Sequence, residues 1–139
     1  MKNPFCCEIV RGKGAVALLA LRLVAGPAFI LHGWPKFQHA TNWMGDTFPS
    51  WLQALAAFAE FGGGIALLLG LLTQLAALGI GIVMLVAMFM VHIPKGDPFV
   101  GHGGGSWEPA ADYLAMMIAL MLRGAGSLSL DALLFKRKD

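Results

Sequence analysis

AVALLALRLVAGPAFIL, residues 15–31, is an apolar run of membrane length that contains one charged residue, Arg22. A second run, WLQALAAFAEFGGGIALLLGLL (residues 51–72), contains Glu60 as its single charge. A charge at the centre of a bilayer costs roughly 2.5–3.5 kcal/mol on insertion scales, so such residues normally face other helices and are paired. The two runs therefore predict a helical membrane bundle in which Arg22 and Glu60 form a buried ion pair.

The composition of the whole chain agrees with a position in the bilayer. Of 139 residues, 58% are hydrophobic and 13% are charged, and the mean hydropathy is +0.70. These values leave too little polar surface for a water-soluble domain. The formal net charge of +2 is too small to indicate nucleic-acid binding. We therefore expect the lipid bilayer as a partner, no nucleic acid, and one domain spanning residues 1–139.

Four segments are long and apolar enough to cross a hydrocarbon core of about 30 Å as helices. They are residues 14–33, 51–72, 74–93 and 109–124. Their continuous apolar runs lack the alternation of a membrane β-barrel, and Arg22 interrupts the first run, which argues against a secretory signal peptide. The prediction is an all-α bundle of four transmembrane helices.

Lysine and arginine positions predict the orientation of this bundle, because positive residues are retained in the cytoplasm. With an even number of spans both termini lie on one side, and that side carries Lys2, Arg11, Lys13, Arg123, Lys136, Arg137 and Lys138. The other side carries Lys36 and Lys95. Both termini are therefore predicted to be cytoplasmic. Tryptophans concentrate at membrane interfaces, and the outer interface would hold Trp34, Trp43, Trp51 and Trp107.

The predicted pair of Arg22 and Glu60 has two interpretations. A rise of 1.5 Å per residue places both side chains about 15–18 Å below the outer helix ends. Gly63 and Gly64 share a helix face with Glu60, and small residues let a neighbouring helix approach closely. The pair is then either a structural contact that fixes helix register or a site that handles protons or substrate.

A second set of polar residues gathers at the predicted outer helix ends. Its members are His32, Lys36, His92, Glu108 and Asp112. Glu108 and Asp112 are four residues apart and share one helix face, where two neighbouring carboxylates can share a proton. Histidine can exchange protons near neutral pH. This set is the predicted site for chemistry or ligand binding, and the alternative is that each residue simply meets water at a helix end.

Two other patterns are interpreted as structural. Met84, Met88 and His92 recur every four residues and could supply ligands to copper(I), but methionine stripes usually serve packing, so no metal is predicted. Cys6 and Cys7 are adjacent, which strains a disulfide, and the cytoplasm is reducing. The sequence contains no haem, dinucleotide or phosphate-loop motif. A redox cofactor would then be a diffusible quinone or belong to a partner.

The order of motifs along the chain carries a family resemblance. The motifs are Leu21-Arg22-Leu23, His32-Gly33 with Lys36, Glu60-Phe61-Gly62-Gly63, Leu69-Gly70-Leu71-Leu72-Thr73, His92, Glu108 with Tyr113, and Gly124-Ala125-Gly126-Ser127-Leu128-Ser129-Leu130-Asp131. Over residues 15–131 they resemble the DoxX family of small bacterial membrane proteins. Pro109 and Asp112 depart from the family pattern, which leaves the role of Glu108 open.

The resemblance implies four transmembrane helices in the bacterial inner membrane and a redox setting. The family is named for a subunit associated with a thiosulfate:quinone oxidoreductase or quinol oxidase. We therefore expect a membrane subunit or anchor linked to a quinone-dependent oxidoreductase or redox-detoxification system. A quinone is the expected cofactor, and oxidoreductase subunits or further copies of the chain are the expected partners. The alternatives are a non-catalytic structural or assembly protein and a transporter of small hydrophobic molecules.

Overall fold

The computed structural model describes residues 9–135, and within this range the chain is all-α, as predicted. The elements in order are α1 (Lys13–Gln38), the 3-10 turn η1 (Gly45–Thr47), α2 (Ser50–Leu69), α3 (Thr73–Val86), the π-helix η2 (Ala87–His92), α4 (Glu108–Arg123) and α5 (Leu130–Leu134). The predictions for Cys6 and Cys7 fall outside the described residues.

Within residues 9–135, three helices are long and apolar enough to cross a membrane. They are α1, α2 and the continuous helix that α3 and η2 form over residues 73–92. These match the first three predicted spans, except that α1 continues past Gly33 and through Pro35 to Gln38. Helix α4 has 16 residues, about 24 Å at 1.5 Å per residue, which is short for a span. That α4 crosses the bilayer stays a prediction.

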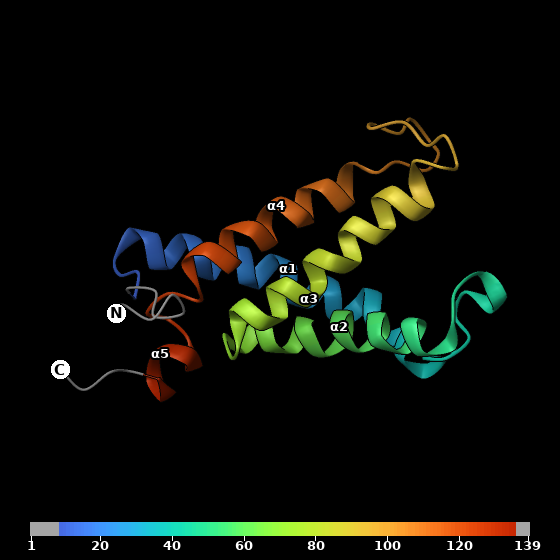
Figure 1. Ribbon diagram of the computed structural model, residues 1–139. Helices are drawn as coiled ribbons and strands as arrows, with labels where there is room; N and C mark the ends of the chain where they lie inside the picture. The colour runs from blue at the N-terminus through green and yellow to red at the C-terminus, as the bar shows by residue number, and fades with distance from the viewer. Residues whose placement is uncertain (1–8, 136–139) are drawn as a thin grey trace, which may run out of the picture.

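The helices form a bundle whose neighbours follow the order of the chain. Helix α1 packs on α2, α2 on α3, and α3 on α4. Figure 1 shows the start of α1, the end of α4 and α5 at one end of the bundle, and the long connections before α2 and α4 at the other. The predicted site residues at helix ends belong to this second end. Which end faces the cytoplasm stays a prediction.

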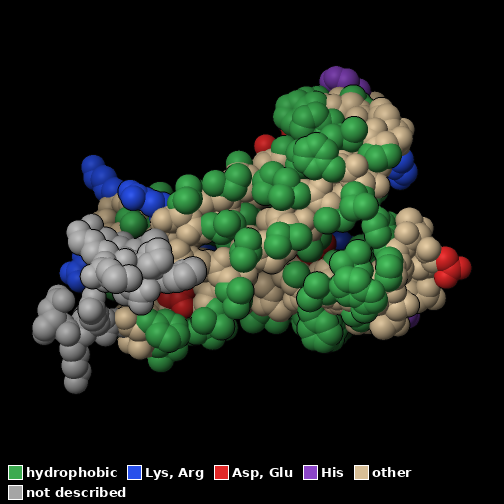
Figure 2. Space-filling view, in the orientation of Figure 1, with side chains coloured by type: hydrophobic (Ala, Val, Ile, Leu, Met, Phe, Trp, Pro, Cys, Tyr) green, Lys and Arg blue, Asp and Glu red, His purple; other side chains and the backbone are tan. Residues whose placement is uncertain are grey.

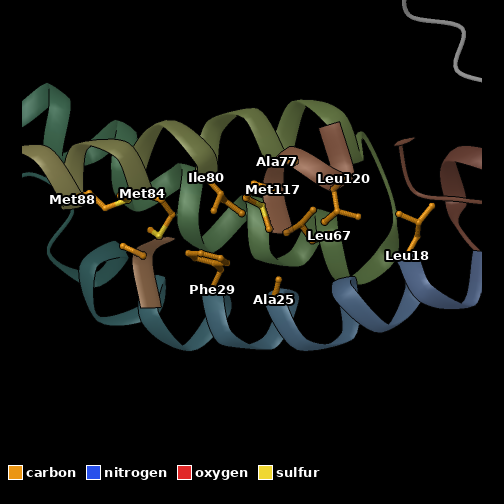
Figure 3. Packing of buried hydrophobic residues seen from close by; sticks show 11 residues of the cluster. Leu18, Ala25, Phe29, Leu67, Ala77, Ile80, Met84, Met88, Met117 and Leu120 are labelled. Atoms are coloured by element: carbon orange, nitrogen blue, oxygen red, sulfur yellow. The ribbon is translucent and has the colours of Figure 1, made fainter. Parts of the chain in front are cut away.

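A buried apolar core runs along the bundle between the long helices. Figure 3 shows it with side chains from α1 (Leu18, Ala25, Phe29), α2 (Leu67), α3 and η2 (Ala77, Ile80, Met84, Met88) and α4 (Met117, Leu120). Met84 and Met88 are each 8% exposed within this cluster. The methionine stripe therefore packs in the core.

Glycines bring the backbones of α1 and α2 into contact. A Cβ at Gly33 would lie 2.5 Å from Phe61 N, and a Cβ at Gly64 would lie 2.7 Å from Ile30 N. A larger residue at either position would push the helices apart. These contacts fix the register of the two helices, with Gly33 opposite Phe61 and Gly64 opposite Ile30.

The C-terminal part of the described chain is tied to the turn between α2 and α3. Gly70 ends α2 in the left-handed conformation at φ +67°, where glycine carries no steric penalty. The Asp131 carboxylate accepts the backbone N–H of Leu72 at 2.7 Å and that of Thr73 at 3.0 Å. A carboxylate at a helix start satisfies free N–H groups, so Asp131 caps α3.

Candidate functional site

Arg22 and Glu60 are both 1% exposed, but they do not contact each other, so the predicted ion pair is wrong. Arg22 lies beside Leu67, which is seven residues, about 10 Å, further along α2 than Glu60. The sequence-based depths assumed that the first helix ends at Gly33. Because α1 continues to Gln38 and the glycine contacts set its register, the two charges lie at different levels.

The guanidinium of Arg22 donates to four backbone carbonyls. Nε donates to Leu67 O at 2.8 Å and Nη2 to Leu68 O at 3.3 Å. Nη1 donates to Ala125 O at 3.0 Å and to Leu128 O at 2.8 Å. The first two carbonyls belong to the end of α2, where the helix dipole is negative. Arg22 is thus held by backbone carbonyls, with the Asp131 carboxylate near enough to interact with its charge, and it joins α1 to α2 and to the segment after α4.

Glu60 pairs with Lys36. The ammonium Nζ of Lys36 lies 2.6 Å and 2.7 Å from the two carboxylate oxygens of Glu60. The same Nζ lies 4.6 Å from the ring centroid of Trp43, a favourable cation–π distance. The side chain of Lys36 is 27% exposed and that of Glu60 is 1% exposed. One partner of this charged pair therefore reaches the surface, while the other depends on it for charge compensation.

Gln53 holds the connection between α1 and α2 against the bundle. Its side chain is buried at 2% exposure. Oε1 accepts the backbone N–H of Met44 at 2.8 Å, Nε2 donates to Gly45 O and Phe48 O at 2.7 Å each, and the backbone carbonyl accepts the indole N–H of Trp43 at 3.0 Å. Residues 43–48, which we call the cap segment, are fixed on α2 by these bonds.

We expect Gln53→Ala to loosen the cap segment. The substitution removes three side-chain hydrogen bonds, and each lost bond that leaves a buried backbone group unpaired costs about 1–3 kcal/mol. Hydrogen exchange of residues 43–48 should rise by about tenfold or more, while exchange in α4 stays unchanged. Gln38→Ala, at the exposed end of α1, is the matched control. Equal exchange in both variants would show that other contacts hold the segment.

A cavity of about 520 Å³ lies between α2 and α3 and extends to the cap segment and η2. Its titratable lining residues, among those described, are Lys36, Glu60 and His92, and the rest of the lining is mostly apolar. Figure 2 shows a hollow on this face, bordered by hydrophobic side chains, with basic and acidic side chains visible in its depth. An apolar cavity with a few convergent polar groups is the usual form of a small-molecule site.

His92 is the last residue of the π-helix η2 and lies at the edge of this cavity. Its Nδ1 lies 2.7 Å from the Asp97 carboxylate, which orients the ring. Short π-helical turns occur frequently at functional sites. The ring of His92 is thus held in place at the cavity that Lys36 and Glu60 also line.

The structure brings two of the five predicted outer-site residues to the cavity, Lys36 and His92. The other three do not line it. His32 and Asp112 are exposed on α1 and α4, and Glu108 is half-buried at the start of α4. A second cavity of about 520 Å³, between α3, α4 and α5, contains none of the five.

The sequence analysis did not assign Gln53 or Asp97 to this region, and it placed Trp43 only at the outer membrane interface. Gln53 had a usable signal, because a glutamine inside an apolar run needs hydrogen-bond partners. Trp43 and Asp97 lie in connections with no regular pattern, and only the folded chain brings them to Lys36 and His92.

Long apolar helices that bury charges in their bundle define a multi-pass membrane protein. The profile of the DoxX family matches residues 17–93. A Haemophilus influenzae relative, described as "Uncharacterized protein", is 33% identical over 130 residues, which cover 86% of this chain and 92% of the relative. The chain therefore belongs to the DoxX family, and the resemblance found in the sequence is confirmed.

Two further relatives have more specific names. "Putative oxidoreductase CatD" of Bacillus subtilis is 30% identical over 129 residues, covering 88% of this chain and 90% of the relative. "Inner membrane protein YqjF" of Escherichia coli is 29% identical over 128 residues, covering 88% of this chain and 95% of the relative. No solved structure matches the chain.

Proposed function

We propose that this DoxX family protein is a membrane subunit or anchor of a quinone-linked oxidoreductase or redox-detoxification system in the bacterial inner membrane. The observation that carries the proposal is the charged pair of Lys36 and Glu60 in the lining of an otherwise mostly apolar cavity. The names of the Bacillus subtilis and Escherichia coli relatives support the redox setting and the location.

The residues around the cavity fit a quinone headgroup. The Lys36 ammonium has three protons and directs two of them to Glu60, so one remains for a quinone carbonyl. The Trp43 ring supplies an aromatic face beside it. His92, oriented by Asp97, can donate or accept through its other ring nitrogen.

When bound, a quinone would supply a redox couple that exchanges electrons and protons. The contribution of this chain is to bind the ring and to manage protons. The Glu60 carboxylate can take up a proton released at the ring. Until then the Lys36 ammonium stabilises the negative charge of that carboxylate. The electrons would pass to or from partner subunits, and both these partners and a homo-oligomer belong to the proposal. The cytoplasmic termini inferred from the basic residues are part of it as well.

A structural or assembly role is the second candidate, and the Arg22 network favours it. All four carbonyls bound by Arg22 serve to join helices, and none of them lies in the lining of the cavity next to Glu60. In this second candidate, the pair of Lys36 and Glu60 also serves only to join helices, and the protein binds no quinone.

Quinone titration of the purified protein in lipid nanodiscs distinguishes the two candidates. Short-chain ubiquinone and menaquinone should quench tryptophan fluorescence saturably. His92→Ala should weaken binding about fivefold, the equivalent of one hydrogen bond of about 1 kcal/mol. His32→Ala, exposed and outside the cavity, is the matched control and should bind normally. Folded wild-type protein that shows no saturation would contradict the proposal and favour the structural role.

A further inference from the structure

The cavity between α2 and α3 is shaped as a groove that is open to the side. Ala56, Ala59 and Gly79 line it and are half-buried, and a Cβ at Gly79 would lie 3.6 Å from Ala59 Cβ. Leu55 and Ile82 also line it but are 60% and 53% exposed. Small residues therefore form the floor where the helices meet, and large residues that face the lipid form the sides. A molecule dissolved in the bilayer can enter between them without crossing water.

The groove is longer than a single ring requires. Along α3 and η2 its lining runs from Leu75 through Val86 to His92. Leu75 and Val86 are eleven residues apart, about 16 Å at 1.5 Å per residue. On α2 the lining ends at Glu60, so the part beside Leu75 extends beyond the charged pair. That part has no titratable residue among its described lining residues, which suits a hydrocarbon chain.

The charges of the groove favour a neutral headgroup. Lys36 and Glu60 neutralise each other, and the remaining titratable lining residue among those described, His92, is engaged by Asp97. A fatty acid or phospholipid would bring an anion that competes with Glu60 for Lys36. It would then leave the Glu60 carboxylate buried without a cation, which is strongly unfavourable. A neutral ring with hydrogen-bonding oxygens keeps the pair intact.

From these three features we infer that the groove binds the hydrocarbon tail of a lipid-soluble quinone. The ring lies at the charged pair, and the tail follows α3 past Gly79 towards Leu75. The inference rests on the proposed quinone function and extends it, because it selects long-tailed, neutral quinones that arrive from the bilayer over tailless soluble ones.

The test is photolabelling in nanodiscs with a ubiquinone ring that carries a decyl chain ending in a diazirine. We expect label on α3 within residues 75–82 and loss of most of that label when excess unlabelled decyl-ubiquinone is added. Binding of the tailless ring is measured in parallel by tryptophan quenching.

Two matched glycine substitutions locate the tail. Gly79→Leu places a side chain in the groove, and its Cβ makes an ordinary contact, so the variant should fold. Gly62→Leu adds the same side chain on the exposed face of α2, where a Cβ would meet nothing within 4 Å. Gly79→Leu should reduce specific labelling about tenfold, because the groove is overfilled, and leave binding of the tailless ring within about twofold. Gly62→Leu should alter neither.

The outcomes separate this inference from the proposed function. Label that is not displaced by decyl-ubiquinone, or that is equal in both glycine variants, would show that bilayer lipid fills the groove and overturn the tail site, even if the ring still binds. If Gly79→Leu weakened binding of the tailless ring as much as binding of the decyl-chain ligand, the tail site would also be overturned, because the ring itself would then lie at Gly79. Absence of saturable ring binding by folded wild-type protein would instead overturn the quinone function.

Discussion

Arg22→Leu is expected to remove most of the folded protein from the membrane. The substitution deletes four hydrogen bonds from a charged donor, each worth about 1.5–3 kcal/mol, and leaves carbonyls without their partner. Even partial compensation leaves a loss of at least ~4 kcal/mol, which is comparable to the total stability of many proteins. The amount of monodisperse protein after detergent extraction measures the effect.

Arg22→Lys should yield little more folded protein than Arg22→Leu. The guanidinium spreads its donors over a rigid fork, and this fork reaches the end of α2 with Nε and Nη2 and the segment after α4 with Nη1. An ammonium concentrates its three donors at one point and cannot span both sides. Arg11→Leu, an exposed arginine before α1, is the control and should accumulate normally.

The Arg22→Leu/Glu60→Leu double variant gives a sharper result. If the two residues were an ion pair, removing both would recover the folded protein. Because Arg22 binds carbonyls and Glu60 binds Lys36, the double variant should be at least as unstable as Arg22→Leu. Recovery of folded protein in the double variant would instead support the ion pair of Arg22 and Glu60 that the sequence predicted.

The sequence predicted the long helices and the buried charges, and it did so from local properties. The lengths of the apolar runs are visible in the chain itself, so α1, α2 and the helix over residues 73–92 were expected within a few residues. The burial of Arg22 and Glu60 followed from the same runs, because a charge in such a segment must face other helices.

The partners of these charges could not be predicted in the same way. They depend on helix register, which is set where Gly33 meets Phe61 and Gly64 meets Ile30, and on the end of α1. The predicted first span ended at Gly33, yet α1 continues through Pro35 and thereby carries Lys36 to Glu60. Contacts between distant segments decide both points, and a single sequence does not display them.

At the candidate site, too, the sequence predicted the polar residues but not which of them meet in the folded chain. Lys36 and His92 stood out as polar residues at helix ends, and both line the cavity. His32, one turn before Lys36 on α1, has the same chemical character as His92 but is exposed. His32 and Lys36 share a face of α1, so which of the two meets Glu60 depends on how the end of α1 packs against α2 and not on residue type.

Lys36→Met is expected to destabilise the protein more than Glu60→Leu. Without Lys36, the Glu60 carboxylate stays at 1% exposure with no cation, and breaking a buried pair in this way costs about 3–5 kcal/mol. Without Glu60, the 27% exposed Lys36 side chain can turn its ammonium to the surface. Thermal unfolding in detergent should therefore show the larger loss of stability for Lys36→Met, and the reverse order would contradict the unequal burial of the two side chains.

The Lys36→Met/Glu60→Leu double variant separates the structural role of the pair from its proposed function. Replacing both charges by apolar side chains removes the desolvation cost together with the attraction, so the folded protein should recover. Quinone binding should not recover, because the cavity has lost the ammonium that donates to the ring and the carboxylate that takes up its proton. The affinity for ubiquinone, measured by tryptophan quenching, should fall at least about tenfold relative to wild type, which corresponds to the loss of one hydrogen bond from a charged donor. A folded double variant with wild-type quinone affinity would assign Lys36 and Glu60 to packing alone.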